Sequence, residues 1–423
     1  MPSLKLENWA PASFRKHILG QEILTIDALC QLMMESDGEY SSYLISDRVL
    51  TAFEKLDEEE TLSFFNTLND EYDLDIAELN GFVKDYAEDP SDHNLRAITH
   101  AAEPRRQELF RRLNMAPHGT KRLVKMREKL LKLSRSHSEL KRMDVDFKHL
   151  FGSWFNRGFL TMEPIDWTSP AHILEKIIAY EAVHEIGSWR ELRARLEPAD
   201  RRCYAFFHPA MEDEPLVFVE VALMDDIPDK IDDILSPERE QLSIDQANCA
   251  IFYSISNCHT GLAGVSFGNF LIKHVATHLQ QEIPQIKKFV TLSPVPGFKK
   301  WLESNQSPEE AALLLEQSAT NEDASDLDSL LPLAAEYFLN QKTPAGEPLD
   351  PVARFHLKNG ARLERLNLAA DTSEKGQQQS LGLMVNYHYN LEKVEENHER
   401  YMKAGEVTAS SGIKKHLPRR IFS

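Results

Sequence analysis

The feature that most constrains the fold is a change of hydrophobic pattern along the chain. From Gly20 to about Phe155, apolar residues recur three and four positions apart, as in Leu56–Leu68 and His118–Leu133. This is the spacing of amphipathic helices. Further along, short runs rich in β-branched and aromatic residues alternate with turn-forming stretches, which is typical of strands. The sequence therefore predicts an α+β protein, with an all-helical domain over residues 1–154 and a second domain over residues 155–423.

Six short runs in the second part are predicted strands: 202–207, 216–223, 249–256, 287–293, 362–370 and 382–389. A helix from Pro170 to about His184 is expected before them, because Ser169 can cap it and proline is favoured at a first helical position. A helical insertion is expected around residues 307–340, where Ser307, Pro308 and Glu310 form a capping box.

The composition excludes several functional classes. The chain has 423 residues, a net charge of −19 and an isoelectric point near 5.3, whereas nucleic-acid binders are usually basic. No apolar run approaches the roughly 20 residues that a membrane helix needs, and the N-terminus lacks the apolar core of a secretory signal. The four cysteines lie far apart and form no C-x-x-C pair. We therefore expect a cytoplasmic protein that has no disulfides, spans no membrane and binds no nucleic acid.

The stretch TLSPVPGFKKWL, from Thr291 to Leu302, holds a serine in an unusual setting. Ser293 ends an apolar run and is followed by Pro-Val-Pro-Gly. Proline fixes its own φ and pushes the preceding residue toward extended geometry. The stretch predicts either a rigid turn or a rigidly positioned hydroxyl.

A glycine-containing loop follows the predicted strand 249–256 and precedes a predicted helix. Such a loop can bring backbone N–H groups close to a phosphate. The same segment, Gly264-Val265-Ser266-Phe267-Gly268, also fits the G-x-S-x-G elbow of serine hydrolases. The elbow needs the strand to end directly before the serine, and here Asn257 to Ala263 intervene. Hydrolysis through Ser266 is therefore a minority interpretation.

Four further residues are weaker candidates on the sequence alone. His274 and His278 have a zinc-ligand spacing, but HVATH lacks the glutamate of HExxH, so a solvated helix face is favoured and no metal site is predicted. His356 lies in a short apolar stretch before the turn signal Asn359-Gly360. Tyr389 closes the last predicted strand. By type and setting alone, His356 and Tyr389 are more often structural than catalytic.

Several long pieces of the chain together resemble the malonyl-CoA decarboxylase family. They are FNRGFLTMEPIDWTSP, YEAVH, RRCYAFFHP, EPLVFVEVAL, AIFYSIS, GLAGVSFGNFLIK, LSPVPGFKKWL, DPVARFHLKNGA and GLMVNYHY. They occur in order over most of Phe155 to Tyr389. The resemblance implies an N-terminal helical domain used for homo-oligomerisation, as a dimer or tetramer. It also implies a second domain with a GNAT acetyltransferase-like fold and a mixed, mostly antiparallel sheet.

The resemblance also implies a set of site residues. Ser293, in Leu-Ser-Pro, and His356, in F-H-L-x-N-G, match the family's catalytic residues. Tyr389 and Ser254 match positions near its site. The loop that takes the CoA pyrophosphate corresponds to Ala263, Gly264, Val265, Ser266, Phe267, Gly268 and Asn269. Some relatives carry a glutamate where this chain has Ser266, so an essential role for that glutamate does not transfer here.

The implied reaction is the loss of CO2 from malonyl-CoA through a thioester enolate, giving acetyl-CoA. The thioester is the electron sink, so we expect no metal and no cofactor besides the CoA of the substrate itself. A histidine with a pKa near 6.5 can supply a proton near neutral pH, and this assigns His356 as the acid with Ser293 as its partner. A CoA-dependent acyltransferase, a serine hydrolase and a non-enzymatic scaffold remain the alternatives, although a scaffold would not explain the settings of Ser293 and His356.

Overall fold

The computed structural model describes residues 24–36, 39–265, 271–307 and 327–417, without the side chains of residues 39–41. These residues form two compact units. The first, called the helical unit, comprises the described residues up to Asn156 together with Pro209–Glu212 and His259–Val265. The second, called the sheet unit, comprises the remaining described residues. Ala263, Gly264 and Val265, which begin the predicted CoA loop, thus belong to the helical unit.

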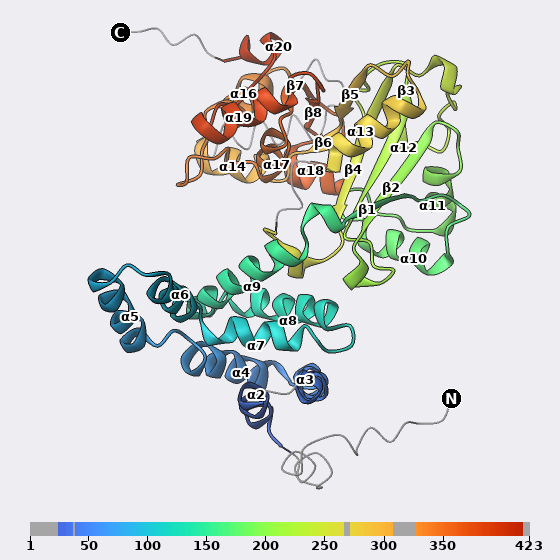
Figure 1. Ribbon diagram of the computed structural model, residues 1–423. Coiled ribbons are helices and arrows are strands. Elements are labelled where there is room, and N and C mark those ends of the chain that lie inside the picture. Colours follow the sequence, from blue (N-terminus) through green and yellow to red (C-terminus); the bar gives the residue numbers. More distant parts are fainter. Residues whose placement is uncertain (1–23, 37–38, 266–270, 308–326, 418–423) are drawn as a thin grey trace, which may run out of the picture. The chain divides into compact units, whose positions relative to one another are not determined.

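The helical unit consists of helices α2 to α9 and short 3₁₀ turns (Figure 1). The helices are α2 (Ile26–Glu35), α3 (Glu39–Glu54), α4 (Glu58–Glu71), α5 (Ile76–Glu88), α6 (Asp92–Ala101), α7 (Arg105–Leu113), α8 (Gly119–Leu133) and α9 (Lys141–Trp154). Helix α4 begins at a capping box made by Asp57 and Glu60, which satisfies two backbone N–H groups of its first turn. Phe110 and Phe147 stack in the core, with ring centroids 4.2 Å apart. The predicted helical character of this part is confirmed.

One buried arginine joins α8 to the segment 259–265. Arg127 is fully buried, and its Nε donates to Asp144 Oδ1 at 2.8 Å. Its two terminal nitrogens donate to the carbonyl oxygens of Gly261 and Ala263 at 2.7 and 2.8 Å. Gly261 itself is pressed against α8, because a Cβ there would come within 2.0 Å of the Val124 carbonyl oxygen. These contacts fix the first residues of the predicted CoA loop on the helical unit.

The sheet unit is built on eight strands in the order β1-β2-β3-β4-β5-β8-β6, with β7 paired to β8 (Figure 1). The strands are β1 (Thr161–Pro164), β2 (Arg201–Phe207), β3 (Val217–Met224), β4 (Cys249–Asn257), β5 (Lys288–Thr291), β6 (Ser293–Pro294), β7 (Arg362–Asn367) and β8 (Met384–His388). Among these described strands, β4 and β5 pair in parallel and every other pair is antiparallel. This is the mixed, mostly antiparallel sheet that the resemblance implied.

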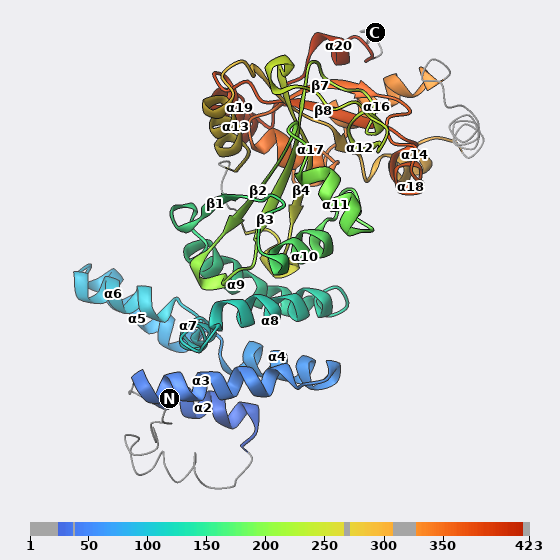
Figure 2. The same cartoon turned by 90° about the vertical axis from the view of Figure 1, so that its right-hand side faces the viewer.

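Helices cover both faces of the strands. They are α10 (Ala171–Tyr180), α11 (Trp189–Leu196), α12 (Asp232–Leu235), α13 (Leu271–Glu282), α14 (Phe298–Asn305), α16 (Leu330–Leu339), α17 (Pro351–Lys358), α18 (Glu374–Ser380), α19 (Val394–Ala404) and α20 (Ser411–Lys414). Ile177 of α10 and Leu192 of α11 pack with Ala205 of β2 in one apolar cluster. His278 of α13 contacts the ring of Tyr204, whose side chain alternates with that of Ala205. Figure 2 accordingly shows α11 and α13 on opposite sides of the strands.

The structure differs from the sequence prediction at several elements. Strand β1 was not predicted, and it is a short, largely exposed edge strand. Helix α10 ends at Tyr180 rather than near His184. Its N-cap is Pro170 rather than Ser169, because the Ser169 hydroxyl instead accepts from the backbone N–H of Asp166.

Two predictions concern the segment between β6 and β7. Helix α16 lies within the range expected for a helical insertion, whereas Pro308 and Glu310 of the proposed capping box lie outside the described residues. The stretch around His356 forms helix α17, which the apolar pattern alone did not indicate.

The Arg127 contacts give a stability prediction. Replacing Arg127 with Met leaves two carbonyl oxygens without their donor and leaves Asp144 with only Lys148 as a cation. We expect the free energy of unfolding to fall by roughly 3–5 kcal/mol, as for other buried pairs that lose one partner. Urea titration followed by circular dichroism measures this. As a control, Arg193→Met breaks an exposed pair with Glu197 and should change stability by less than about 1 kcal/mol; equal losses would contradict the assignment.

Candidate active site

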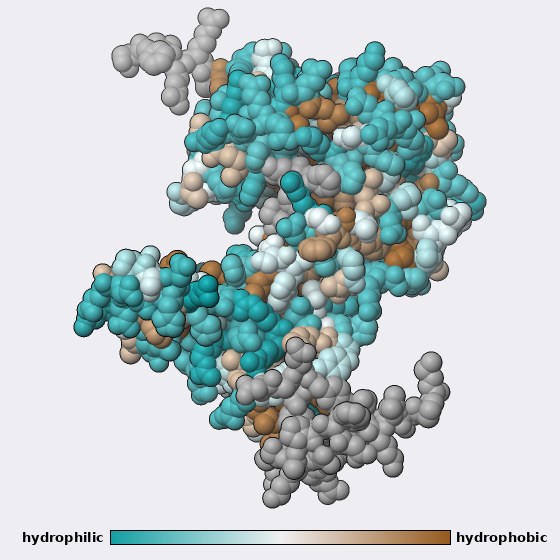
Figure 3. All heavy atoms as spheres, in the orientation of Figure 1, coloured by the Kyte–Doolittle hydropathy of each residue, from teal (hydrophilic) through white to brown (hydrophobic). Residues whose placement is uncertain are grey.

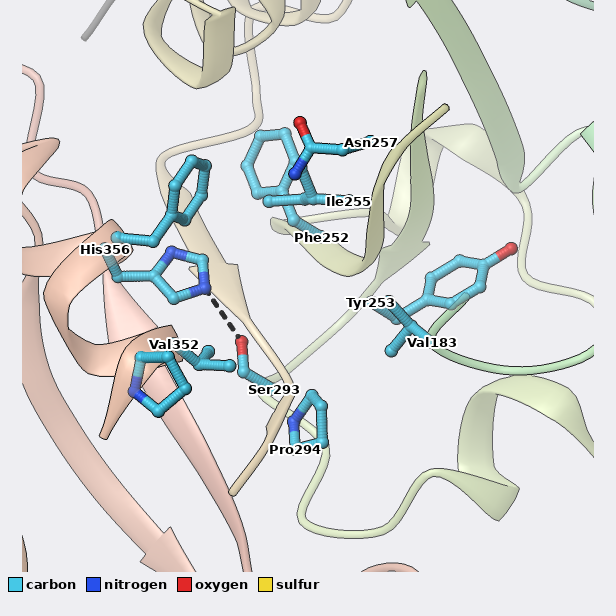
Figure 4. A pocket seen from close by; sticks show the side chains of 11 residues that line it. Val183, Phe252, Tyr253, Ile255, Asn257, Ser293, Pro294, Val352 and His356 are labelled. Carbon is cyan, nitrogen blue, oxygen red and sulfur yellow. Dashed lines mark hydrogen bonds between the residues drawn. The ribbon is translucent and has the colours of Figure 1, made fainter. Parts of the chain in front are cut away.

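The site lies where two parallel strands separate. Strands β4 and β5 pair up to Phe252 and Thr291. Beyond that point β4 continues beside β3, while Ser293 and Pro294 form β6 and pair with β8. A cavity of about 240 Å³ opens between the separated segments (Figure 4). It is lined by Val183, Phe252, Tyr253, Ile255, Asn257, Ser293, Pro294, Pro351, Val352, Phe355 and His356.

Ser293 is held at one wall by strand pairing and by a second hydroxyl. It lies opposite Val385 of β8 and is 5% exposed. Its Oγ donates to Thr291 Oγ1 at 2.8 Å, and Thr291 Oγ1 also accepts from the backbone N–H of Tyr387 at 3.1 Å. The hydroxyl is therefore fixed by its surroundings, as the sequence Ser-Pro-Val-Pro suggested.

His356 reaches the same cavity from helix α17. Asp350 caps this helix by accepting from the Ala353 N–H at 2.8 Å, and Pro351 occupies the first turn. Positions 351, 352, 355 and 356 then share one helix face, which is the face that lines the cavity. Gly360 follows with φ of +81°, where a Cβ would meet the Val394 carbonyl oxygen. The predicted turn at Asn359-Gly360 is thus present, and it ends the helix.

The two predicted catalytic side chains touch, and Tyr389 completes a chain of hydrogen bonds. His356 Nε2 lies 3.1 Å from Ser293 Oγ, and Nδ1 lies 2.7 Å from the Tyr389 hydroxyl. The Ser293 hydroxyl donates its proton to Thr291 Oγ1. His356 Nε2 therefore carries the proton that is donated to Ser293, and Nδ1 accepts from the Tyr389 hydroxyl. Figure 4 shows the imidazole pointing toward Ser293 across the cavity. The ring also stacks on Tyr387, with centroids 4.4 Å apart.

Burial decides the charge of these groups. Desolvation lowers the pKa of His356 to about 3, because a buried imidazolium loses its hydration. Desolvation also raises the pKa of Tyr389 well above its ordinary value, so its hydroxyl keeps its proton. The pKa near 6.5 that the sequence suggested for His356 therefore does not hold in the ligand-free protein. Its imidazole is neutral at pH 7.

Among the described residues that line it, the cavity offers a bound group no permanent positive charge. None of its lining residues is lysine or arginine. Most of them are apolar, and the polar side chains nearest one another are the hydroxyl of Ser293 and the imidazole of His356. His356 is therefore the lining residue that can gain a positive charge by taking up a proton.

The other predicted site residues lie outside the cavity or outside the described part of the chain. Ser254 does not line the cavity; its hydroxyl donates to the two oxygens of Glu181, at 2.8 and 2.7 Å. Gly264 has φ of +73°, and Ala263 is bound to Arg127. Ser266, Phe267, Gly268 and Asn269 lie outside the described residues. Lys273, which could have faced a CoA phosphate, is paired with Glu395.

Sequence reasoning missed several residues that shape the cavity. Thr291 stood beside Ser293 in the stretch that drew attention, but nothing indicated that its hydroxyl would accept from Ser293. Val183 and Glu181 lie in YEAVH, which served only as part of the family resemblance. The Asp350-Pro351 pair is a typical helix start. It could have predicted a helix that carries both Val352 and His356.

Comparison with known proteins identifies the family of this chain. The malonyl-CoA decarboxylase C-terminal domain matches residues 158–422, and the N-terminal domain of the same family matches residues 72–155. The chain belongs to the malonyl-CoA decarboxylase family. It is 37% identical to the mitochondrial malonyl-CoA decarboxylase of Anser anser anser, over 73% of this chain and 69% of that protein. It is 34% identical to the protein of that name from Mus musculus, over 75% of this chain and 72% of the relative.

Solved structures of the family are similar over nearly the whole chain. The malonyl-CoA decarboxylase from Rhodopseudomonas palustris is 50% identical, with a TM-score of 0.87, covering 92% of this chain and 98% of that one. The malonyl-CoA decarboxylase from Agrobacterium vitis is 51% identical with the same TM-score, covering 93% of this chain and 100% of that one.

Within the described ranges, no helix is long and apolar enough to cross a membrane. The described residues likewise contain no cluster of three or more histidine, cysteine or acidic side chains that could hold a metal ion. All four cysteines are free and buried. His274 and His278 both lie on α13 without further ligands to form such a cluster.

Burial of His356 predicts a specific pH dependence of stability. The folded-state pKa of about 3 lies below the unfolded value of 6.5, so the unfolded chain binds the extra proton. The contribution of His356 is complete above pH 6.5 and is lost as the pH falls from 6.5 toward 3, by up to about 1.4 kcal/mol per pH unit. Denaturant unfolding of the wild type and of His356→Gln at several pH values measures this. The stability difference between the two should shrink with acid, and a difference independent of pH would contradict it.

Proposed function

We propose that this protein converts malonyl-CoA to acetyl-CoA and CO2, with Ser293 and His356 acting on the malonyl group. The observation that supports this most directly is the 3.1 Å contact between Ser293 Oγ and His356 Nε2 at the wall of the cavity. Family membership supports the substrate, since the relatives are named for this reaction. The roles of the two residues follow from chemistry.

In the reaction the bond between C2 and the carboxyl carbon breaks, and its electron pair moves toward the thioester oxygen. CO2 leaves, and C2 of the resulting enolate takes a proton. A hydrogen-bond donor aimed at the thioester oxygen stabilises this charge more in the transition state than in the ground state. In the ligand-free site the Ser293 hydroxyl donates to Thr291 and His356 Nε2–H donates to Ser293. When substrate binds, this O–H and this N–H both turn to the thioester oxygen at the cavity wall.

The lack of lysine and arginine in the lining favours the forward reaction. A cation beside the malonyl carboxylate would stabilise the charged reactant, and so would full hydration. An apolar wall of Val352, Phe355 and Pro294 does neither. The carboxylate therefore loses its hydration in this site and gains few polar contacts in return. The charge that develops on the thioester oxygen is instead stabilised by hydroxyl and imidazole donors.

The proton balance involves His356. The imidazole is neutral without substrate, because burial lowers its pKa to about 3. The negative charge of the bound substrate favours the imidazolium, whose Nε2–H is directed toward the thioester oxygen rather than the carboxylate, so binding brings in one proton from solvent. After CO2 leaves, Ser293 gives its proton to C2 and takes the proton from Nε2, which returns His356 to neutrality. One proton is consumed per acetyl-CoA, as the reaction requires.

We propose that the segment beginning at Ala263 binds the CoA pyrophosphate. The positive φ of Gly264 and the Arg127 contacts to Gly261 and Ala263 support a preformed backbone there. Because the Ala263 carbonyl oxygen accepts from Arg127, the N–H of Gly264 across the same trans peptide points away from Arg127. The hydrolase alternative is disfavoured, because β4 ends at Asn257, well before Ser266.

The test of this function is a turnover assay with matched variants. Purified protein is incubated with malonyl-CoA, and acetyl-CoA and CO2 are quantified. Ser293→Ala and His356→Ala should each lower kcat by about 10²- to 10³-fold, since each removes one donor. Ser304→Ala and His149→Ala, both exposed, serve as controls and should keep full activity. Full turnover in both site variants would contradict the site, and release of free CoA only when an acyl acceptor is present would indicate an acyltransferase.

We also propose that the protein is a cytoplasmic homo-oligomer, dimer or tetramer, assembled through its helical unit. The four free, buried cysteines are compatible with a reducing compartment. Support for assembly comes from the α5–α6 hairpin, neither helix of which has a buried residue. Ile76, Val83 and Leu95 on it are 56%, 48% and 47% exposed. Figure 3 shows tan and brown residues among the teal ones over this hairpin.

Size-exclusion chromatography with light scattering tests the assembly. We expect the wild type to be larger than its 48.4 kDa chain and Val83→Glu with Leu95→Glu to shift toward the monomer, because a charge in an apolar contact is costly. A charge placed at exposed Met402 of α19 is the control. A monomeric wild type would contradict the proposal.

A further inference from the structure

A buried carboxylate outside the cavity holds two of its walls together. Glu181 follows helix α10 and is 8% exposed. Its Oε1 accepts from the backbone N–H groups of Val183 and His184 at 2.8 and 2.7 Å. Both of its oxygens accept from Ser254, at 2.8 and 2.7 Å, and Oε2 also accepts from Ser256 at 3.1 Å. Glu181 is thus hydrogen-bonded both to the turn that follows it in the chain and to strand β4.

The residues on both sides of this carboxylate line the cavity. Val183 lines it from the turn, and Tyr253, Ile255 and Asn257 line it from β4. A further bond, from the Ala182 N–H to Ser256 Oγ at 3.2 Å, joins the same two segments. Figure 4 shows Val183 beside Tyr253, whose ring points away from the Ser293–His356 pair. The distance between the two walls is therefore set by hydrogen bonds that converge on Glu181.

Strand β4 needs such a contact at this point. Its register with β3 shifts, so that Val221 faces Phe252 and Glu220 faces Ser254. Tyr253 is the extra residue of a bulge, and a bulge locally disrupts the ladder. Ser254 comes directly after it, and Glu181 accepts the Ser254 hydroxyl there. The carboxylate thereby fixes the strand at the residue where β-pairing fixes it least.

We propose that Glu181 is a positioning residue that sets the place of Val183 against β4, and that Val183 determines which acyl groups the cavity admits. The proposal rests on the decarboxylase function proposed above. It assigns Ser254 an indirect role: the hydroxyl touches Glu181 rather than the substrate. In this proposal the methyl branch on C2 of methylmalonyl-CoA lies against Val183, which lines the same cavity as Ser293 and His356, and one methyl in an apolar pocket is worth about 10- to 200-fold in specificity.

The experiment compares kcat/KM for malonyl-CoA and methylmalonyl-CoA in wild type, Glu181→Gln, Ser254→Ala and Val183→Ala. The ratio of the two values does not depend on how much of the enzyme is folded, so a merely structural loss leaves it unchanged. We expect Val183→Ala to change the ratio at least about 10-fold in favour of the branched substrate. Glu181→Gln should shift the ratio in the same direction and lower kcat for malonyl-CoA about 10- to 100-fold, because the walls lose their spacing. KM should change less than kcat.

Asp200→Asn is the matched control. Asp200 is a buried carboxylate of the same unit that pairs with Arg239 and accepts from the Leu242 N–H, and none of these three residues lines the cavity. Its ratio should equal that of the wild type. If Glu181→Gln fails to fold, Ser254→Ala removes one donor and keeps the carboxylate, and it should give a smaller shift in the same direction. Wild-type ratios in Glu181→Gln, Ser254→Ala and Val183→Ala would overturn the inference. An inactive wild type would instead refute the function.

Discussion

The separation of two parallel strands is the constraint on which the rest of the site depends. Pairing between β4 and β5 stops after Phe252 and Thr291, and the cavity lies between the segments that follow. A strand that leaves its neighbour exposes backbone groups, and buried backbone groups need partners. Here β6 finds them on β8, and β4 keeps β3. The sheet can open at this point because other strands accept both separated segments.

The chemistry of the site comes from neutral groups in a fixed order. Tyr389 donates to His356, His356 to Ser293 and Ser293 to Thr291. A buried charge without a partner is costly, and the ligand-free site avoids that cost by keeping the imidazole neutral. The substrate supplies the negative charge that makes a positive imidazole favourable. The ligand-free site is therefore stable, and His356 takes up its acidic proton only when the negatively charged substrate is bound.

Much of the fold could be predicted from hydrophobic periodicity. The runs around β2, β3, β4 and β8 were identified as strands because each is rich in β-branched and aromatic residues. Strand β1 was missed because an exposed edge strand has no such pattern, and α17 was missed because it is short and its apolar face is narrow. Ser293 and His356 were identified by their motifs. Ser254 was given a place near the substrate, but the bulge at Tyr253 and the buried Glu181 turn its hydroxyl to a different partner.

The order of helical and sheet parts, and the motifs of the two residues that meet in the cavity, follow from the chain alone, since local pattern and motif are properties of neighbours in the chain. Three properties arise only once the chain has folded: the charge state of His356, the link between Val183 and β4 through Glu181, and the attachment of Gly261 and Ala263 to Arg127. These depend on burial and on hydrogen bonds between segments far apart in sequence. Desolvation acts on a side chain only when the whole fold has removed its water, and no local pattern contains that information.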